Sequence, residues 1–318
     1  MDELLRTPVR TLHELARRGT MAAVAEATGF TPGAVSQQVA ALERAVGVPL
    51  VVRAGRRVLL TDAGRTLAER AGRLVAAEEE ALEAIRGEDT AVAGALHLGI
   101  FGGTAAALLP AVLAAVGEQH PELRVTSREV DVDDAAGAVR RGDVDVAFGL
   151  DYSSAPIPRG RDVELVQLRT ERFSVVSADG PRAPARRPVD LAGFADADWV
   201  LPPARTHYGE AIRSVCRTAG FEPRAAHELL DTVATLTLAA HGAGLAPATP
   251  MMLGLVPGLP LRVVELVQEL RRDVVLVRRE ADARRDKVVA VTATVRGVVQ
   301  SPLSRAAGAP AVRSPSAP

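Results

Sequence analysis

Two neighbouring stretches near the N-terminus carry the residue pattern of short α-helices. Residues 20–28 supply small and apolar positions, and residues 32–43 repeat apolar positions at spacings of four and three. Thr20 and Thr31 stand immediately before the two stretches, where a hydroxyl can cap the start of a helix. Gly29 lies between them and suits the left-handed backbone that ends many helices. The pattern predicts two helices joined by a tight turn.

The surface positions of the second helix are small or hydrogen-bonding and nearly uncharged. They include Gly33, Ser36, Gln37 and Gln38. The second helix of a helix-turn-helix has this character when it enters the major groove of DNA. For the pair taken alone, an ordinary helical hairpin in a protein core is the alternative. The segments that follow decide between the two interpretations.

Residues 50–61 form two β-rich runs around a basic tip. This arrangement predicts a β-hairpin. Arg53, Arg56 and Arg57 gather at its tip, where arginines suit contact with DNA phosphates or with the narrow minor groove. A solvated turn is the alternative. Directly after a helix-turn-helix, the hairpin is typical of a wing, so residues 1–60 are predicted to form a winged DNA-binding domain.

A long helix is predicted over residues 61–86, which contain no proline. Leu60, Leu67 and Leu74 recur every seven residues and give it an apolar stripe. A helix of this length that projects from a small domain cannot bury such a stripe alone. Pairing with a second copy of the chain is therefore expected, with packing on its own chain as the alternative. Residues 87–93 have the composition of a hinge.

Strand and helix patterns alternate from residue 94 onward, which predicts an α/β fold. The pattern favours two subdomains, the first made from residues 94–160 and 267–300 and the second from residues 161–266. The last segment, 301–318, is rich in Pro, Ser and Ala and is expected to be disordered.

Charge and composition fit one basic domain within a globular protein. The whole chain has 318 residues and a formal net charge of -1, whereas residues 1–65 hold nine arginines against six acidic residues. That sign suits a DNA-binding end. The single cysteine, Cys216, excludes an internal disulfide, and neither a signal peptide nor an apolar run of membrane-spanning length is evident. A soluble, cytoplasmic and nucleoid-associated protein is expected.

The order of these parts resembles the LysR-type transcriptional regulators. The strongest match is a block that runs through the second helix, the hairpin and the start of the long helix, at residues 31–39, 42–43, 47–50, 53, 56–57 and 60–64. Looser matches fall at expected places of the effector domain, at residues 94–99, 108–110, 142–147 and 242–247. Together they cover the chain from residue 1 to about 300.

The resemblance implies a winged helix-turn-helix, a dimerising linker helix and a periplasmic-binding-protein-like effector domain of two α/β subdomains. It also implies a homodimer or homotetramer on inverted-repeat promoter DNA, a small-molecule effector between the subdomains, and RNA polymerase as a partner if the protein is an activator. By motif position the DNA-binding residues would be Thr20, Thr31, Pro32, Gly33, Ser36, Gln37, Gln38, Arg53, Arg56 and Arg57.

Two positions depart from the family pattern. Gln37 stands where the family often has arginine, which exchanges a bidentate contact to guanine for a preference for adenine. The first helix of the pair opens with Thr20-Met21-Ala22 in place of the usual Ser-Phe-Thr, so its phosphate contact is left to Thr20.

Ligands of two-lobed α/β domains bind at strand ends and helix starts. Arg205 and His207 suit a carboxylate, whereas Asp131 and Asp151 favour positive charge, so a zwitterion, a neutral molecule and an anion all remain open for a small polar metabolite. The predicted effector-binding residues are Phe101, Gly102, Gly103, Thr104, Asp131, Asp151, Tyr152, Arg205, His207, Thr232 and Thr249.

An enzyme and a different winged-helix regulator are the alternatives. No nucleophile elbow, P-loop or zinc-protease motif occurs, and the six histidines are scattered without ligand spacing. No catalytic residue, metal or cofactor is therefore predicted. The two-lobed tail argues against other winged-helix families, which mostly carry helical or unrelated tails.

Overall fold

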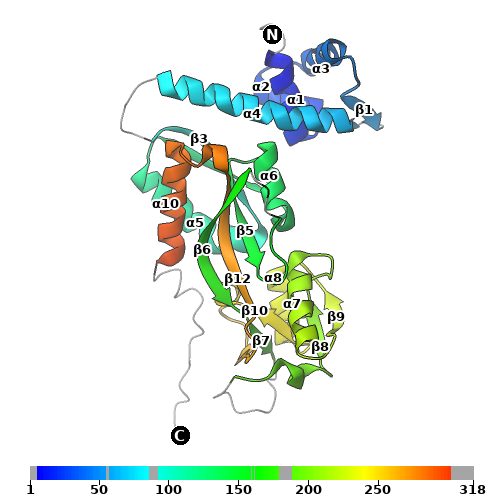
Figure 1. Ribbon diagram of the computed structural model, residues 1–318, viewed down its shortest axis with the longest axis vertical. Helices are drawn as coiled ribbons and strands as arrows, with labels where there is room; N and C mark the ends of the chain where they lie inside the picture. Colours follow the sequence, from blue (N-terminus) through cyan, green and yellow to red (C-terminus); the bar gives the residue numbers. More distant parts are fainter. Residues whose placement is uncertain are drawn as a thin grey trace. The chain divides into compact units, whose positions relative to one another are not determined.

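The computed structural model describes residues 6–54, 57–85, 92–158, 160, 162–178 and 188–301 (Figure 1). The chain divides into two compact units. One comprises residues 1–90 with 137–144, and the other comprises residues 91–136 with 145–318. The predicted hinge and tail lie largely outside the described residues, at 86–91 and from 302 onward.

The first unit begins with three helices that bury the apolar positions expected from the sequence. These are α1 (Arg6–Arg18), α2 (Met21–Thr28) and α3 (Pro32–Val46). Val35, Val39 and Leu42 of α3 are each no more than 1% exposed. They pack against α1 and α2 in a small core, which leaves the opposite face of α3 to solvent.

Local capping sets the turn between α2 and α3. The Thr20 hydroxyl accepts a hydrogen bond from the Ala23 amide, and the Thr31 hydroxyl accepts one from the Ala34 amide, both at 3.2 Å. Gly29 ends α2 with φ = 73°, a conformation that costs glycine little because it has no Cβ. The predicted helix-turn-helix and both of its caps are confirmed.

A two-stranded antiparallel hairpin follows α3 and precedes a long helix. Strand β1 (Val51–Ala54) pairs with β2 (Arg57–Leu60), and α4 then runs over Asp62–Ile85. The Glu43 carboxylate of α3 accepts hydrogen bonds from the amides of Leu50 and Val51, at 2.8 and 3.1 Å. This carboxylate fixes the start of the hairpin to the second helix of the helix-turn-helix.

The first lobe of the second unit is built on a five-stranded sheet in the order β4-β3-β5-β12-β6. Strands β3, β4 and β5 run parallel, β12 runs antiparallel to its neighbours, and α5 and α10 lie side by side. The segments of this lobe are β3 (Gly94–Ile100), α5 (Gly102–Gln119), β4 (Leu123–Glu129), η2 (Val132–Asp134), β5 (Val146–Tyr152), β6 (Val163–Arg172), β12 (Arg271–Arg279), η4 (Glu280–Asp282) and α10 (Asp286–Gln300). Helix α6 (Ala135–Arg141) follows η2 in the sequence, and most of it is grouped with the first unit.

The second lobe contains a three-stranded sheet, β10-β7-β11, and a parallel pair, β8-β9. One continuous hydrophobic core runs through both lobes and includes Phe148 of the first and Trp199 of the second. The elements are β7 (Ser174–Ser177), η3 (Leu191–Phe194), β8 (Asp198–Leu201), α7 (His207–Thr218), β9 (Arg224–Glu228), α8 (Thr232–Ala240), β10 (Ala246–Ala248), α9 (Pro250–Gly254) and β11 (Arg262–Glu265).

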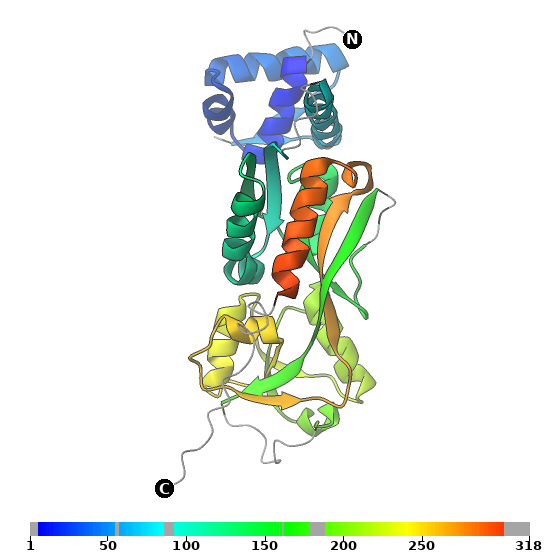
Figure 2. The same cartoon turned by 90° about the vertical axis from the view of Figure 1, so that its left-hand side faces the viewer.

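Two long paired strands, β6 and β12, connect the lobes (Figure 2). The sequence pattern placed residues 161–170 in the second subdomain, but β6 pairs along most of its length with β12 in the first sheet. The chain therefore changes lobe near residue 173. Strand β6 lies at the edge of this sheet, and buried and exposed positions are mixed along it.

No described helix is long and apolar enough to cross a membrane.

Replacement of Gly64 by alanine should loosen the junction between the hairpin and α4. A Cβ at Gly64 would lie 2.0 Å from the carbonyl oxygen of Leu50, so the backbone must move. We expect a loss of about 1–3 kcal/mol in the free energy of unfolding, measured by denaturant titration.

The matched control is Gly117→Ala in α5, where an added Cβ meets no atom within 4 Å. This change should instead stabilise by about 0.4–1 kcal/mol through the lower entropy of the unfolded chain. Equal effects of the two substitutions would contradict the tight contact at Gly64.

Candidate DNA-binding surface and effector cavity

The exposed face of α3 carries most of the residues predicted to contact bases. Pro32, Gly33, Ser36 and Gln37 are exposed, and Thr31 is exposed at the helix start. None of these side chains is charged. The face can offer hydroxyl and amide groups to base edges, while any attraction to phosphates must come from elsewhere.

Gln38 differs from its neighbours because it is half-buried against α1. Its side-chain oxygen accepts a hydrogen bond from the hydroxyl of Thr11, a residue that is only 2% exposed. The sequence placed Gln38 among the DNA-binding residues, and in the fold its side chain contacts α1. Its amide group helps to set the position of α3 relative to α1.

Thr20 and the hairpin supply the other predicted DNA contacts. Thr20 is exposed but its hydroxyl is engaged in capping α2. Arg56 lies outside the described residues. Arg53 and Arg57 have their backbones in β1 and β2, and the structure does not describe where their side chains lie.

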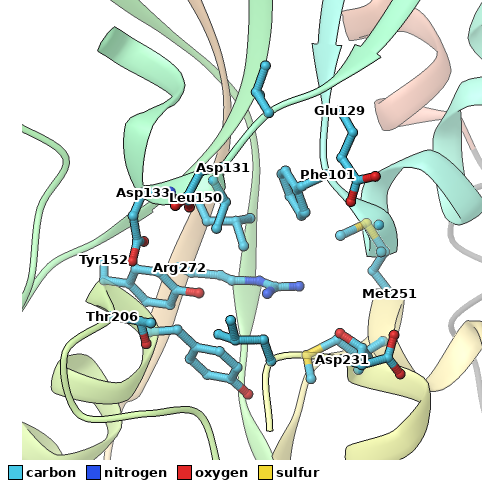
Figure 3. Close-up of a pocket in the computed structure, with 18 of the residues that line it drawn as sticks. Phe101, Glu129, Asp131, Asp133, Leu150, Tyr152, Thr206, Asp231, Met251 and Arg272 are labelled. Atoms are coloured by element: carbon cyan, nitrogen blue, oxygen red, sulfur yellow. Dashed lines mark hydrogen bonds between the residues drawn. The ribbon is translucent and has the colours of Figure 1, made fainter. Parts of the chain in front are cut away.

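The second unit contains an open cavity of about 810 Å³ between its two lobes (Figure 3). The first lobe contributes the carboxyl ends of the parallel strands β3, β4 and β5, where α/β sheets characteristically bind ligands. The second lobe contributes the starts of α7 and α8 and residues of α9. Polar and apolar side chains from distant parts of the sequence therefore share one wall.

Seven of the predicted effector residues line this cavity, and four do not. The seven are Phe101, Gly102, Gly103, Asp131, Tyr152, Arg205 and Thr232. Thr104 and Thr249 are fully buried behind the wall, and Asp151 is buried and accepts a hydrogen bond from the Ile157 amide. His207 is not among the lining residues and contacts Asp133, which is one of them.

A buried arginine that sequence reasoning missed reaches into the centre of the cavity (Figure 3). Arg272 is 4% exposed, and its Nε and Nη2 atoms donate to the Glu171 carboxylate at 3.0 and 2.8 Å. Nη2 also donates to the Thr249 hydroxyl at 2.9 Å, and the guanidinium lies 5.4 Å from the centroid of the Phe173 ring. Burial disfavours the charge, but the facing Glu171 carboxylate holds the pKa of Arg272 above its ordinary value.

Three stacked aromatic rings flank this arginine. The Tyr152 and Tyr208 ring centroids are 5.7 Å apart with an interplanar angle of 8°, and Phe173 packs against both. The Tyr208 hydroxyl donates to the Pro247 carbonyl at 3.1 Å, whereas the buried Tyr152 hydroxyl has no hydrogen-bond partner among the described residues. Burial raises the pKa of Tyr152 to about 12 and also raises the pKa of Tyr208.

A histidine–carboxylate contact links the two lobes at the edge of the cavity. His207 at the start of α7 places its Nδ1 atom 3.1 Å from Asp133 of η2, and its backbone amide donates to the same carboxylate at 3.2 Å. The contact joins two segments that are 74 residues apart in the chain.

Carboxylates outnumber basic groups around the cavity, a feature that the sequence showed only in part. Asp131 was predicted there, and Glu129, Asp133 and Asp231 join it from β4, η2 and the start of α8. Asp131 and Asp231 each cap a helix through one oxygen, accepting from Asp133 and Ala234 amides. A carboxylate in a helix-cap position is already explained by the cap, so the sequence carries no additional sign that it also faces a ligand.

A helix-turn-helix with a hairpin, combined with a two-lobed α/β unit that holds a cavity, is the architecture of a DNA-binding regulator with an effector-binding domain. Two family models cover almost the whole described chain. One, described as "Bacterial regulatory helix-turn-helix protein, lysR family", matches residues 7–65, and the other, described as "LysR substrate binding domain", matches residues 90–300. The chain belongs to the LysR family of transcriptional regulators, and the expected fold and family are confirmed.

Curated relatives agree with this assignment. The chain is 27% identical over 268 residues to the HTH-type transcriptional regulator ShiR of Corynebacterium glutamicum, covering 82% of this chain and 88% of that protein. It is 26% identical to the probable cat1 operon transcriptional activator of Acinetobacter lwoffii, covering 68% and 71%. A probable hydrogen peroxide-inducible genes activator of Mycobacterium leprae is 26% identical, with 71% of each chain covered.

Solved structures share the fold at lower identity. A full-length OxyR variant from Pseudomonas aeruginosa superposes with a TM-score of 0.72 and 20% identity, covering 92% of this chain and 97% of that one. The LysR-family regulator CbnR superposes with a TM-score of 0.62 and 20% identity, covering 95% and 100%. CbnR has also been solved in complex with its target DNA, and that structure matches with a TM-score of 0.60, 21% identity and coverage of 93% and 99%. The family is one of transcriptional regulators, and nothing in these similarities indicates catalysis.

The two tyrosines should resist ionisation in the folded protein. Tyr152 and Tyr208 are the only tyrosines of the chain, so phenolate absorbance reports on them alone. With the pKa of Tyr152 at about 12 and that of Tyr208 raised as well, little phenolate should form in the native protein at a pH of about 11. In denaturant both should titrate near a pH of about 10.

The same shifts predict how stability depends on pH. Because folding raises both phenol pKa values, the stabilisation is present below about pH 10 and is lost as the pH rises through the folded-state values. The Tyr152→Phe variant serves as the control. Because only Tyr208 remains in it, its unfolding at high pH should give half the phenolate absorbance that unfolding of the unchanged protein gives. A native titration centred near the denaturant value would contradict the burial of this pair.

Proposed function

We propose that this protein binds promoter DNA through the exposed face of α3 and that a small polar metabolite in the cavity modulates the binding. The observation that carries the proposal is the cavity of about 810 Å³, lined by polar groups of both lobes. A molecule that contacts both lobes stabilises one degree of their closure over others. The linker helices would pass that change to the spacing of the DNA-binding units.

Recognition of bases is assigned to Ser36 and Gln37, with Pro32 and Gly33 allowing close approach of the helix. A glutamine side chain can form paired hydrogen bonds with adenine. Thr20, Thr31 and the arginines Arg53, Arg56 and Arg57 are assigned to the phosphate backbone. The exposed side chains of the first turns of α3 are uncharged, which supports this division because phosphate attraction must then come from basic groups elsewhere, such as those of the hairpin.

A homodimer or homotetramer on an inverted-repeat site is part of the proposal. Leu74 of α4 is 53% exposed, so part of the apolar stripe is not covered by this chain. A cytoplasmic, nucleoid-associated location belongs to the proposal as well, because a regulator of promoters must reach the chromosome. Contact with RNA polymerase follows only if the protein activates transcription.

A gel-shift assay with the DNA upstream of its own gene tests promoter binding. The expected result is a retarded band whose affinity falls with rising salt, as phosphate contacts require. A thermal-shift screen against a metabolite library tests the second half, because a molecule that binds only the folded state raises the unfolding temperature. Absence of a retarded band at low salt would refute the DNA-binding assignment.

Gln37→Ala and Gln38→Ala should separate base contact from helix positioning. Gln37 is exposed, so its truncation should cost about 1–3 kcal/mol at one base position of each half-site and leave unfolding unchanged. Gln38 is bound to Thr11, so its truncation should lower the free energy of unfolding by about 0.5–1.5 kcal/mol. Binding to a panel of single-base variants and denaturant unfolding measure the two effects, and the reverse outcome would exchange their assigned roles.

Response to hydrogen peroxide is the alternative suggested by the names of some relatives, and a cysteine is the side chain that such a response would oxidise. Cys216 is the only cysteine, it is 1% exposed on α7, and burial raises the pKa of its thiol to about 12. The reactive species in thiol oxidation is the thiolate, which these surroundings suppress. The burial of Cys216 and the raised pKa of its thiol therefore favour regulation by a metabolite over regulation by an oxidant.

Cys216 should accordingly be inert in the native protein. Iodoacetamide at a pH of about 8 should label it slowly in the fold and much faster in denaturant, as measured by mass spectrometry. Hydrogen peroxide should leave promoter binding unchanged. Rapid native labelling together with loss of the gel shift on peroxide treatment would support the redox alternative.

A further inference from the structure

The charge balance of the cavity constrains what it can bind. Four carboxylates line it, from Glu129, Asp131, Asp133 and Asp231, against two guanidinium groups. One of these, Arg272, is already matched by the buried carboxylate of Glu171. A purely anionic molecule would thus enter a region where negative charge prevails, and it would lose hydration without full compensation.

The carboxylates are not equally engaged with the protein. Asp133 contacts His207. Asp131 and Asp231 each use one carboxylate oxygen to cap a helix, so the other oxygen remains for a ligand. Glu129 and Asp231 lie on the same side of the cavity, next to Met251, so that side offers acceptors to a cation (Figure 3).

A different corner of the cavity offers hydrogen-bond donors. The Tyr152 hydroxyl is buried, has no partner among the described residues, and lies beside Arg272 in the wall (Figure 3). Arg272 donates from Nε and Nη2, while its Nη1 atom makes no hydrogen bond within the described chain. A buried hydroxyl without a partner is unfavourable, and an oxygen atom of a ligand would satisfy it.

We propose that the cavity binds an amphoteric organic molecule. Its ammonium group lies against Glu129 and Asp231, and its carboxylate or carbonyl oxygen accepts from Tyr152 and Arg272. The apolar body of the molecule packs between these ends against Phe101 and Met251. This inference rests on the proposed regulation by a small ligand and specifies the chemical class of that ligand.

Isothermal titration of the full-length protein with matched probes tests the proposal. The probes are 6-aminohexanoate, hexylamine and hexanoate, which share one apolar chain and differ only in their ends. A second series of 4-(aminomethyl)benzoate, benzylamine and benzoate offers an aromatic body of different length. In at least one series the amphoteric member should bind about tenfold more tightly than either singly charged member, a difference of about 1.4 kcal/mol.

Substitutions then assign each end of the probe to a corner of the cavity. Glu129→Gln should remove much of the advantage of the amphoteric probe over the carboxylate probe. Tyr152→Phe should remove much of its advantage over the amine probe. Glu122→Gln, a like change outside the cavity lining, should alter neither ratio. Mere damage to the fold would weaken all three probes together, so the ratios distinguish a ligand contact from a structural role.

Two results would overturn the inference. One is that the carboxylate-only or amine-only probe binds at least as tightly as the amphoteric probe in both series. The other is that no probe binds at concentrations of about 10 mM, which corresponds to an affinity too weak for a built site. The gel shift of the ligand-free protein is scored separately, and its absence would refute the proposed function and leave the probe result to stand by itself.

Discussion

The two-lobed unit depends on one buried ion pair, between Arg272 and Glu171. The two residues are direct partners across β12 and β6, and Tyr152 faces Arg272 from β5 on the other side. A buried pair is tolerated only when its remaining hydrogen-bonding groups are satisfied, and removal of one partner costs about 3–5 kcal/mol. Here the Thr249 hydroxyl and the Met251 amide complete the shell of the pair. The first sheet is thereby tied to α9 of the second lobe.

The same ion pair shapes the binding chemistry of the cavity. Since Glu171 neutralises Arg272, the cavity has a fixed donor in its wall without a matching excess of positive charge. The aromatic stack of Tyr152, Phe173 and Tyr208 shields the pair from water on one side. Polar recognition then comes from a few oriented groups set among apolar side chains of the cavity wall.

The DNA-binding unit holds a polar helix, α3, in a fixed position on a very small hydrophobic core. Val35, Val39 and Leu42 fix one face of α3, and Gln38 and Glu43 fix it further through hydrogen bonds to α1 and to the start of the hairpin. The exposed face is left free for bases. In the proposed function, the uncharged first turns of α3 recognise bases and the basic hairpin attracts phosphates.

The amino-acid sequence by itself determined the helix-turn-helix, the hairpin, the long helix and the α/β class, because caps, periodicity and turns act over a few residues. Thr20 and Thr31 each cap an amide three positions away, and Gly29 ends its own helix. Only the tertiary structure decided that β6 belongs to the first sheet and that Gln38 faces α1. It also brought Arg272 to Glu171 across 101 residues of chain and left the Tyr152 hydroxyl without a partner among the described residues. No local pattern records such contacts, since they arise from strand order and from the cost of burying charge and hydroxyl groups without partners.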